Sequence, residues 1–292
     1  MTLVTHAPAG QGARTVFVGG RYLSESDASI PLFDRGFMFA DGVYEVTAVI
    51  AGRLVDFDLH AARLRRSAAA IGLDPGMDEP GILEMHERLI RLNALENGVI
   101  YLQATRNADD RNFLPSRGAG CLIVAFPQAM DIIGNPRGRE GSRITLLPEQ
   151  RWLRRDIKST GLLAQVMAKS AARDGGFDDA WFVEDGMVTE GASSSAFIVG
   201  ADGVLRTREL DNRILPGTTR KVVLDLARAM GLATSEQAFA PAELLGAREA
   251  FSTSASTFVL PVVSVDGTPI GDGSVGPFTS ELRRRYIERA RS

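Results

Sequence analysis

The sequence predicts an α+β protein of two domains. Across its 292 residues, short apolar runs of strand length alternate with segments in which apolar residues recur at helical spacing. Three Asp-Gly pairs, at 185–186, 202–203 and 266–267, are strong signals for β-hairpins. Residues 127–142 are rich in proline, glycine and charge, which is typical of a linker. We therefore expect a flexible tail at 1–14, a smaller α+β domain at 15–126 and a larger domain at 143–292.

The smaller domain is expected to contain an antiparallel sheet. Apolar runs at 16–18, 43–50, 99–105 and 121–126 indicate strands, whereas 33–42 is too rich in glycine and charge for regular structure. A helix is expected to begin at Asp58, capped by its side chain, and to end at Gly72, and a second to cover about 81–95.

The larger domain is expected to mix strands and helices. A strand at 143–147 precedes a helix at about 161–173, and further helices are expected at about 218–230 and 241–245. The last helix starts at Phe278 and carries the basic run Arg283-Arg284-Arg285. Because Glu281 and Glu288 accompany that run, we expect it to be a solvated face rather than a binding patch.

Composition excludes several functions. A net charge of −3 gives no reason to expect nucleic acid or an anionic membrane as a partner, and the apolar runs are too short to span a bilayer. The tail lacks the apolar core of a signal peptide and a single cysteine rules out an internal disulfide, so the cytoplasm is the expected location. The three histidines, His6, His60 and His86, have no zinc-site spacing, so no metal is expected, and no Gly-x-Ser-x-Gly elbow is present. Acid–base chemistry must then come from a lysine, a tyrosine, a carboxylate or a cofactor.

Lysine is scarce in this chain: Lys158, Lys169 and Lys221 stand against thirty arginines. If the protein holds a carbonyl cofactor as a Schiff base, one of the three must carry it, because arginine is too poor a nucleophile. Lys169 is expected on a solvated helix face and Lys221 in the first turn of another helix. Lys158 follows Trp152 and Ile157, which would shield it from water. From composition alone, the alternative remains that arginine has replaced lysine throughout and Lys158 has no special role.

Three further segments suit a phosphorylated cofactor. Glu190 leaves a strand into the small-residue loop 191–195, where backbone and hydroxyls can approach a ligand. Residues 215–221 place two threonines at a helix N-terminus, which favours an anion. Residues 252–257 form another hydroxyl-rich loop. Taken singly, each has an ordinary structural explanation, such as a solvated glutamate or a threonine cap.

Together these segments offer what pyridoxal 5′-phosphate requires, namely a lysine for its aldehyde, an acid for its ring nitrogen and a nest for its phosphate. An acid on the ring nitrogen keeps the pyridine protonated, which makes the ring a strong electron sink and favours transamination.

The chain resembles the fold-type IV pyridoxal-phosphate enzymes, and among them most closely the D-amino-acid aminotransferases. The resemblance runs from about Val16 to the C-terminus. It lies in four segments that occur in the family's order, 34–36 with 41–46, 151–154, 156–159, and 189–191 with 193–195. It implies a smaller N-terminal α+β domain and a larger C-terminal, β-barrel-like domain with helices. It also implies a homodimer with sites at the domain and subunit junction, where the loop 106–117 enters from the partner chain.

The resemblance further implies roles for individual residues. Lys158 is the catalytic Schiff-base lysine, Glu190 pairs with the pyridinium nitrogen, and Leu215 packs against the ring. The remaining cofactor-binding residues are Arg63, Ser194, Ser195, Gly217, Thr218, Thr219 and Ser254, and the substrate-binding residues are Tyr44, Arg111, Phe113 and Ala255.

The loop 106–117 departs from the family. D-Amino-acid aminotransferases carry Arg-x-His there to grip the substrate α-carboxylate; here Arg111 matches the arginine, the loop is one residue shorter and no histidine is present. Arginine alone can bind a carboxylate, but the missing donor weakens binding by roughly 1–3 kcal/mol. Phe113 makes the site more apolar. Alternatively, Arg111 pairs with Asp109 or Asp110 and never meets a substrate. A second departure is Ala196, where the family often has asparagine.

The expected activity is transfer of an amino group from a D-amino acid to a 2-oxo acid, such as 2-oxoglutarate or pyruvate, by a ping-pong mechanism. The main alternative is an (R)-selective primary amine transaminase. A branched-chain L-aminotransferase, an aminodeoxychorismate lyase and a non-catalytic pyridoxal-phosphate-binding protein are less favoured.

Overall fold

A computed structural model describes residues 14–292, which form two compact units. The first comprises the described residues up to Met130 together with Ile157–Gly161, and the second comprises Asp131–Asp156 and Leu162–Ser292. The expected tail, including His6, lies outside the described residues except for Arg14. The linker expected at 127–142 stays a prediction. Its residues include the end of one strand and the short helix α4 (Arg137–Glu140).

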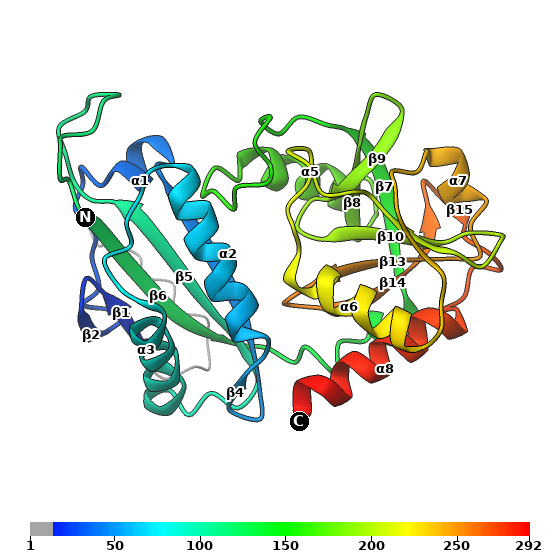
Figure 1. Ribbon diagram of the computed structural model, residues 1–292, viewed down its shortest axis with the longest axis horizontal. Coiled ribbons are helices and arrows are strands. Elements are labelled where there is room, and N and C mark those ends of the chain that lie inside the picture. The colour runs from blue at the N-terminus through cyan, green and yellow to red at the C-terminus, as the bar shows by residue number, and fades with distance from the viewer. Residues whose placement is uncertain (1–13) are drawn as a thin grey trace. The chain divides into compact units, whose positions relative to one another are not determined.

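The first unit is built on a six-stranded sheet in which every pairing is antiparallel (Figure 1). The strand order is β2-β1-β6-β5-β3-β4, so the long strand β5 pairs with the long strands β6 and β3 on its two sides. The strands are β1 (Thr15–Val18), β2 (Arg21–Ser24), β3 (Gly42–Ile50), β4 (Arg53–Leu54), β5 (Gly98–Arg106) and β6 (Cys121–Ala129).

Helices α2 (Phe57–Ala70) and α3 (Glu79–Leu92) pack their apolar side chains onto this sheet (Figure 1). Leu64 and Leu89 from the helices meet Ile100 from β5 in one buried core. The cap expected from Asp58 was wrong: α2 begins one residue earlier, and Asp58 lies in its first turn, where its charge faces the positive end of the helix.

A short helix, α1 (Arg35–Phe39), occupies the segment expected to be irregular. Asp34 caps it, because the Asp34 side chain accepts a hydrogen bond from the Phe37 N–H at 3.1 Å. Glycine and charge therefore mark a capped turn of helix here rather than a loop.

The second unit holds a nine-stranded mixed sheet with the order β12-β11-β10-β13-β14-β7-β8-β9, and β15 pairs with β14. A turn of three residues joins β9, at one edge, to β10, near the other, so the sheet must curl back on itself. This confirms the barrel-like expectation. The strands are β7 (Ser142–Pro148), β8 (Asp179–Glu184), β9 (Met187–Gly191), β10 (Ser195–Val199), β11 (Leu205–Thr207), β12 (Thr234–Glu236), β13 (Glu249–Ser254), β14 (Phe258–Val265) and β15 (Thr268–Pro269).

All three Asp-Gly pairs form the expected hairpins, between β8 and β9, β10 and β11, and β14 and β15. The helices of this unit are α4, α5 (Leu163–Asp174), α6 (Thr218–Ala229), α7 (Pro241–Leu245) and α8 (Pro277–Arg291). None of the helices in residues 14–292 is long and apolar enough to cross a membrane.

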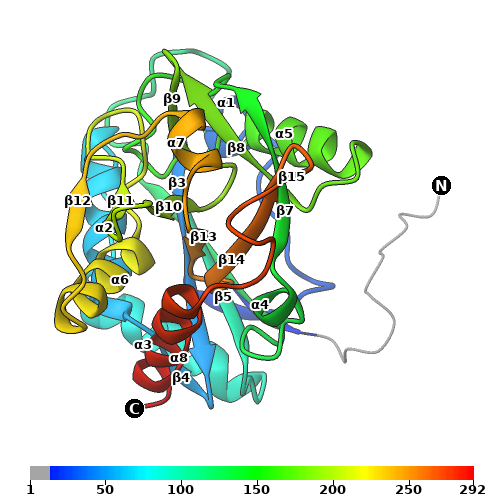
Figure 2. The same cartoon turned by 90° about the vertical axis from the view of Figure 1, so that its right-hand side faces the viewer.

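The final helix, α8, lies against β14 (Figure 2). Arg284 and Arg285 pair with Glu281 as a solvated face should, but the expectation fails for Arg283. The Arg283 guanidinium is buried and donates to four backbone carbonyls, two of which, those of Thr257 and Val259, lie where the turn after β13 leads into β14. The basic run therefore contains one structural arginine.

Candidate active site

The backbone of Lys158 is held by two elements of the first unit. Its carbonyl accepts a hydrogen bond from the Tyr44 N–H at the start of β3, at 3.0 Å, and its own N–H donates to the Ser67 hydroxyl of α2, at 3.2 Å. The Lys158 ammonium nitrogen lies 4.1 Å from the centre of the Tyr44 ring. Lys158 and Tyr44, both expected in the site, are therefore neighbours.

The three lysines differ in their partners. Lys169 pairs with Asp179 at 2.9 Å, and Lys221 pairs with Asp225 at 3.0 Å. Lys158 is half-buried, and within residues 14–292 its ammonium has no hydrogen bond or ion pair; its contact is the aromatic face of Tyr44. An amine that is not engaged by a carboxylate can act as a nucleophile, so Lys158 is the lysine suited to covalent chemistry.

The shielding expected around Lys158 is only partly present. Ile157 is 5% exposed and belongs to the core of the first unit. Trp152 is 48% exposed, so the aromatic residue that motivated the expectation is not buried. Sequence proximity was a poor guide here, because Trp152 and Lys158 belong to different units.

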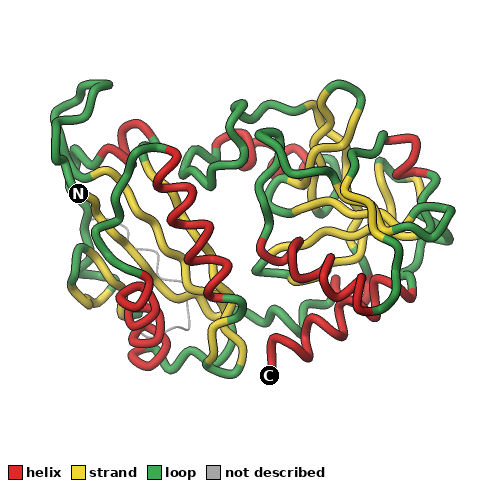
Figure 3. Tube along the Cα trace, in the orientation of Figure 1, coloured by secondary structure: helices red, strands yellow, loops and turns green. Residues whose placement is uncertain are grey.

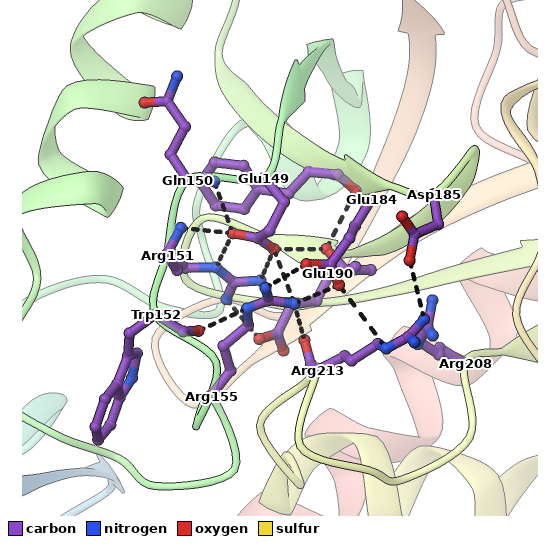
Figure 4. A network of polar contacts seen from close by, with 12 residues as sticks. Glu149, Gln150, Arg151, Trp152, Arg155, Glu184, Asp185, Glu190, Arg208 and Arg213 are labelled. Carbon is purple, nitrogen blue, oxygen red and sulfur yellow. Dashed lines mark hydrogen bonds and ion pairs between the residues drawn. The ribbon is translucent and has the colours of Figure 1, made fainter.

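Glu190, at the end of β9, is buried in the second unit between a cation and a backbone donor (Figure 4). Its carboxylate accepts from the Arg151 guanidinium at 2.6 Å, and both carboxylate oxygens lie 3.1 Å from the Leu215 N–H. Burial raises the pKa of the Glu190 carboxyl, whereas Arg151 and the Leu215 N–H act to lower it. Glu190 was expected to pair with a protonated ring nitrogen. In the structure its cationic partner is Arg151, which the sequence singled out only as part of the segment 151–154.

Arg151 is shared between two buried carboxylates. Besides Glu190, it grips Glu149 with two hydrogen bonds of 2.9 and 2.6 Å, and Arg155 lies 3.6 Å from the same Glu149 carboxylate (Figure 4). Arg155 in turn holds Glu184. Since one guanidinium serves two acids, Glu190 has less than a full counter-charge, and a further cation placed against it would be stabilised.

The N-terminus of α6 contains a buried hydroxyl, that of Thr219, which has no hydrogen-bond partner among the described residues. Gly217 is the N-cap of this helix and provides no side-chain cap, while Thr218 and Thr219 in the first turn are buried. A Cβ at Gly217 would lie 2.7 Å from the Ser195 hydroxyl, so glycine lets the backbone approach the start of β10. A buried, unpartnered hydroxyl at a helix N-terminus fits a phosphate.

The two serine-rich segments around β10 and β13 differ from expectation in one respect. Ser194 lies in the turn before β10, and its buried hydroxyl, too, has no partner among residues 14–292. Residues 252–254 are not loop but the end of β13, and the Ser252 hydroxyl accepts from the Trp181 indole at 3.1 Å. Ser254 remains at the mouth of the turn that contains Ala255, with its hydroxyl 2.7 Å from that of Thr257.

Arg63 projects from α2 into a buried cluster of the first unit. Two of its nitrogens bind the Glu45 carboxylate at 2.7 and 2.8 Å, and His60 Nδ1 lies 2.7 Å from the same carboxylate. Glu45, on β3, belongs to the motif segment 41–46, but no role was assigned to it. It fixes the orientation of the Arg63 guanidinium, which the resemblance implies for phosphate binding. The charged partners hold the pKa of Glu45 well below its usual range, although burial opposes them.

Arg111 and Phe113 lie between β5 and β6. Loops such as this one are drawn in green in Figure 3. Phe113 is 80% exposed, and Arg111 is exposed. The pairing of Arg111 with Asp109 or Asp110 is not seen: within residues 14–292, the Arg111 guanidinium forms no ion pair, and Asp109 instead accepts from Ser116. The guanidinium lies 5.7 Å from the centre of the Phe39 ring, so its charge remains available to a carboxylate.

These residues fit pyridoxal 5′-phosphate. In the described residues, Lys158 is an amine without an ion pair, Glu190 is an acid that shares its cation with Glu149, and the α6 terminus carries the unpartnered Thr219 hydroxyl. Among the supporting residues, Arg151 and Glu45 lie in the motif segments 151–154 and 41–46, but the sequence assigned them no role. Glu149 lies outside those segments and was missed.

Comparisons with known proteins agree with this chemistry. The family described as amino-transferase class IV matches residues 42–265. The D-alanine aminotransferase of Staphylococcus aureus (strain MSSA476) is 37% identical over 277 residues, which cover 94% of this chain and 98% of that protein. The D-alanine aminotransferase of Bacillus licheniformis is 37% identical over 268 residues, covering 92% and 94%.

The fold is likewise shared with solved structures. The branched-chain amino acid aminotransferase of Escherichia coli superposes with a TM-score of 0.89 over 95% of this chain and 94% of that one, at 22% identity. At that identity, the likeness concerns the fold. The matches to family and relatives confirm the resemblance inferred from the motifs, and the chain belongs to the class IV aminotransferases, the fold-type IV family that works with pyridoxal 5′-phosphate.

Proposed function

We propose that this protein transfers the amino group of a D-amino acid to a 2-oxo acid such as 2-oxoglutarate or pyruvate, by a ping-pong mechanism. The observation that carries the proposal is the likeness to D-alanine aminotransferases over nearly the full length of both chains. Lys158, the one lysine of the described chain without a carboxylate partner, supports it.

Each site residue has a task that its surroundings support. When bound, pyridoxal 5′-phosphate supplies an electron sink that makes the substrate Cα–H acidic. Lys158 would carry the proton removed from Cα, with Tyr44 fixing the direction of its side chain. Glu190, set by Arg151 and the Leu215 N–H, would hold a protonated ring nitrogen. The α6 terminus, with Arg63 oriented by Glu45, would bind the phosphate.

Arg111 is proposed to bind the α-carboxylate of the substrate. An exposed guanidinium without an internal partner can bind a carboxylate through two hydrogen bonds, which orients the substrate. We further propose a homodimer in which the loop 106–117 serves the site of the partner chain, and a cytoplasmic location.

An (R)-selective amine transaminase is the second candidate. The specific observation in its favour is Phe113, whose ring is exposed on the same loop, where the family's histidine is missing. An apolar ring in place of a polar donor favours substrates with an apolar group over those with a carboxylate.

The test is a transamination assay with D-alanine and 2-oxoglutarate, in which pyruvate formation is measured. We expect wild-type protein and a Lys169→Ala control to form pyruvate, a Lys158→Ala variant to form none, and L-alanine to be a poor donor. If wild-type protein binds the cofactor but turns over no D-amino acid, the proposal fails. If (R)-1-phenylethylamine reacts in place of D-alanine, the second candidate is correct.

A further inference from the structure

The loop that carries Arg111 and Phe113 has no regular structure of its own. Residues 107–120 connect β5 to β6, and 111–114 are all exposed. A guanidinium that must meet a carboxylate within a few tenths of an ångström cannot depend on a free loop, because misplacement is costly. The position of Arg111 must therefore be set from outside the loop.

Arg35 supplies that support. Its guanidinium, 3% exposed, donates to the Asn112 carbonyl at 2.5 Å and to the Phe113 carbonyl at 3.1 Å. These are the two residues that directly follow Arg111. A planar guanidinium can hold two carbonyls in fixed directions at once, which an ammonium cannot do.

Arg35 is itself tied to the framework of the first unit. Its third bonded nitrogen, Nε, donates to the Asp41 carboxylate at 2.9 Å, and the same carboxylate oxygen accepts from Arg106, the last residue of β5, at 3.0 Å. Arg106 also donates to the carbonyls of Ile71 and Gly72 after α2. The loop is thus anchored at Arg106, the residue that precedes it, and at its centre by Arg35, and these two arginines share one acid.

A ring in α1 completes the support. The Arg35 guanidinium lies 4.8 Å from the centre of the Phe39 ring, the Arg111 guanidinium lies 5.7 Å from it, and the centre of the Phe113 ring lies 5.6 Å from it. The two loop residues with proposed substrate contacts therefore share one aromatic platform, and that platform is packed on the anchor.

The motif segments 34–36 and 41–42 also help to hold the loop in place. The Asp34 carboxylate accepts from the Thr105 hydroxyl at 2.8 Å, and the Asp109 N–H donates to the Phe33 carbonyl at 3.1 Å. A Cβ at Gly36 would overlap the Thr105 side chain. The segments 34–36 and 41–42 thus bring α1 against the base of the loop.

We infer that Arg35 is a positioning residue for substrate recognition. Through the carbonyls of Asn112 and Phe113, it sets where the Arg111 guanidinium and the Phe113 ring stand, and so how strongly the site prefers a substrate with an α-carboxylate. The inference rests on the proposed function, in which Arg111 binds that carboxylate.

The test compares Arg35→Gln and Arg35→Lys with wild-type holoenzyme. For D-alanine, we expect KM to rise at least about tenfold and by more than kcat falls, because the substrate grip is lost rather than the chemistry. For (R)-1-phenylethylamine, which has no carboxylate, KM should change less than about twofold. Arg35→Lys should restore little, because one ammonium cannot span both carbonyls.

A second readout does not depend on turnover. In Arg35→Gln, chymotrypsin should cut after Phe113 several times faster than in wild-type protein. The reason is that the Phe113 carbonyl, which belongs to the cleaved bond, and the Asn112 carbonyl before it lose their hydrogen bonds to Arg35. Arg117→Gln is the matched control. Arg117 lies on the same loop, is exposed, and forms no ion pair or hydrogen bond in the described part of the chain, so both readouts should stay at the wild-type value.

Equal loss on both substrates, or unchanged KM and cleavage, would overturn the inference. If Arg35→Gln does not fold, Phe39→Leu takes its place. This variant keeps every hydrogen bond of Arg35 but removes the platform, so it should raise KM for D-alanine by a smaller factor, and an unchanged KM counts against the inference. If wild-type protein turns over neither substrate, the proposed function fails, and the cleavage result alone decides whether Arg35 holds the loop.

Discussion

Replacing Arg151 with methionine tests the charge arrangement around Glu190. The substitution keeps an unbranched side chain of similar length and removes the cation that Glu149 and Glu190 share, at hydrogen-bond distances of 2.6 to 2.9 Å. Arg151 has a side chain only 6% exposed, so water cannot replace it. Removing one partner from a buried ion pair typically costs about 3–5 kcal/mol. Here, among the described residues, Glu190 loses its cationic partner, and Glu149 keeps only the cation of Arg155, at 3.6 Å. We expect the apoprotein to lose at least about 3 kcal/mol of unfolding free energy at pH 8.

The loss should depend on pH. Burial already raises the pKa of the Glu190 carboxyl, and removing Arg151, which acts to lower that pKa, should raise it further. A buried carboxyl of this kind destabilises the folded state at pH values above its unfolded pKa, and the destabilisation decreases as pH falls through its folded pKa. The difference between Arg151→Met and wild type should therefore be smaller at pH 5 than at pH 8. Adding Glu190→Gln should restore about 1 kcal/mol or more, because one buried charge is removed.

The assay is urea unfolding of the apoproteins followed by circular dichroism at the two pH values. Arg154→Met is the matched control. Arg154 pairs with Asp156 through a side chain that is 46% exposed, so its removal should leave the unfolding free energy nearly unchanged. An Arg151→Met variant as stable as this control, or equally destabilised at both pH values, would refute the reasoning.

Three further outcomes follow from single buried groups. Burial lowers the pKa of His86 to about 4, so the folded state resists protonation of this residue, and roughly 3 kcal/mol of unfolding free energy is lost as pH falls from about 6.5 to 4. The unfolding free energy of His86→Leu should lack this loss, and a variant whose unfolding free energy depends on pH as in wild type would contradict the prediction. Thr219→Val should stabilise the apoprotein by about 1 kcal/mol, because a buried hydroxyl without a partner is removed, yet weaken pyridoxal 5′-phosphate binding in an absorbance titration. A variant that is less stable, or that binds the cofactor as tightly as wild type, would contradict this prediction. Gly42→Ala should cost about 1–3 kcal/mol, because its Cβ would lie 2.8 Å from the Ala104 carbonyl of the neighbouring strand, and thermal unfolding would show whether the strands adjust instead.

Much of the fold was predictable because its signals are local. The Asp-Gly turns fixed three hairpins, and apolar runs marked the long strands, since turn geometry and burial act over a few residues. The capped helix at 35–39 was missed because its acids and glycines resemble a loop when the cap is not recognised. Arg283 was expected to face solvent, because the spacing of residues along a helix does not reveal which backbone carbonyls of other segments lie beside it.

The site was predictable only at its chemically distinctive residues. Lysine is rare here, so Lys158 was conspicuous, and the motif around Glu190 was specific. Arg151 contacts Glu190, which is 39 residues away along the chain, and Glu45 contacts Arg63, which is 18 residues away, and no local pattern signals such pairings. The same holds for Arg35, whose partners lie 77 and 78 residues away.

The most direct test of the proposed transamination is an absorbance spectrum of the holoenzyme during one half-reaction. Adding D-alanine without a 2-oxo acid should remove the visible absorbance of the lysine-bound cofactor, and adding pyruvate should restore it, whereas L-alanine should have little effect. A cofactor that stays bound and visible in excess D-alanine, or that responds to (R)-1-phenylethylamine alone, would contradict a D-amino-acid aminotransferase.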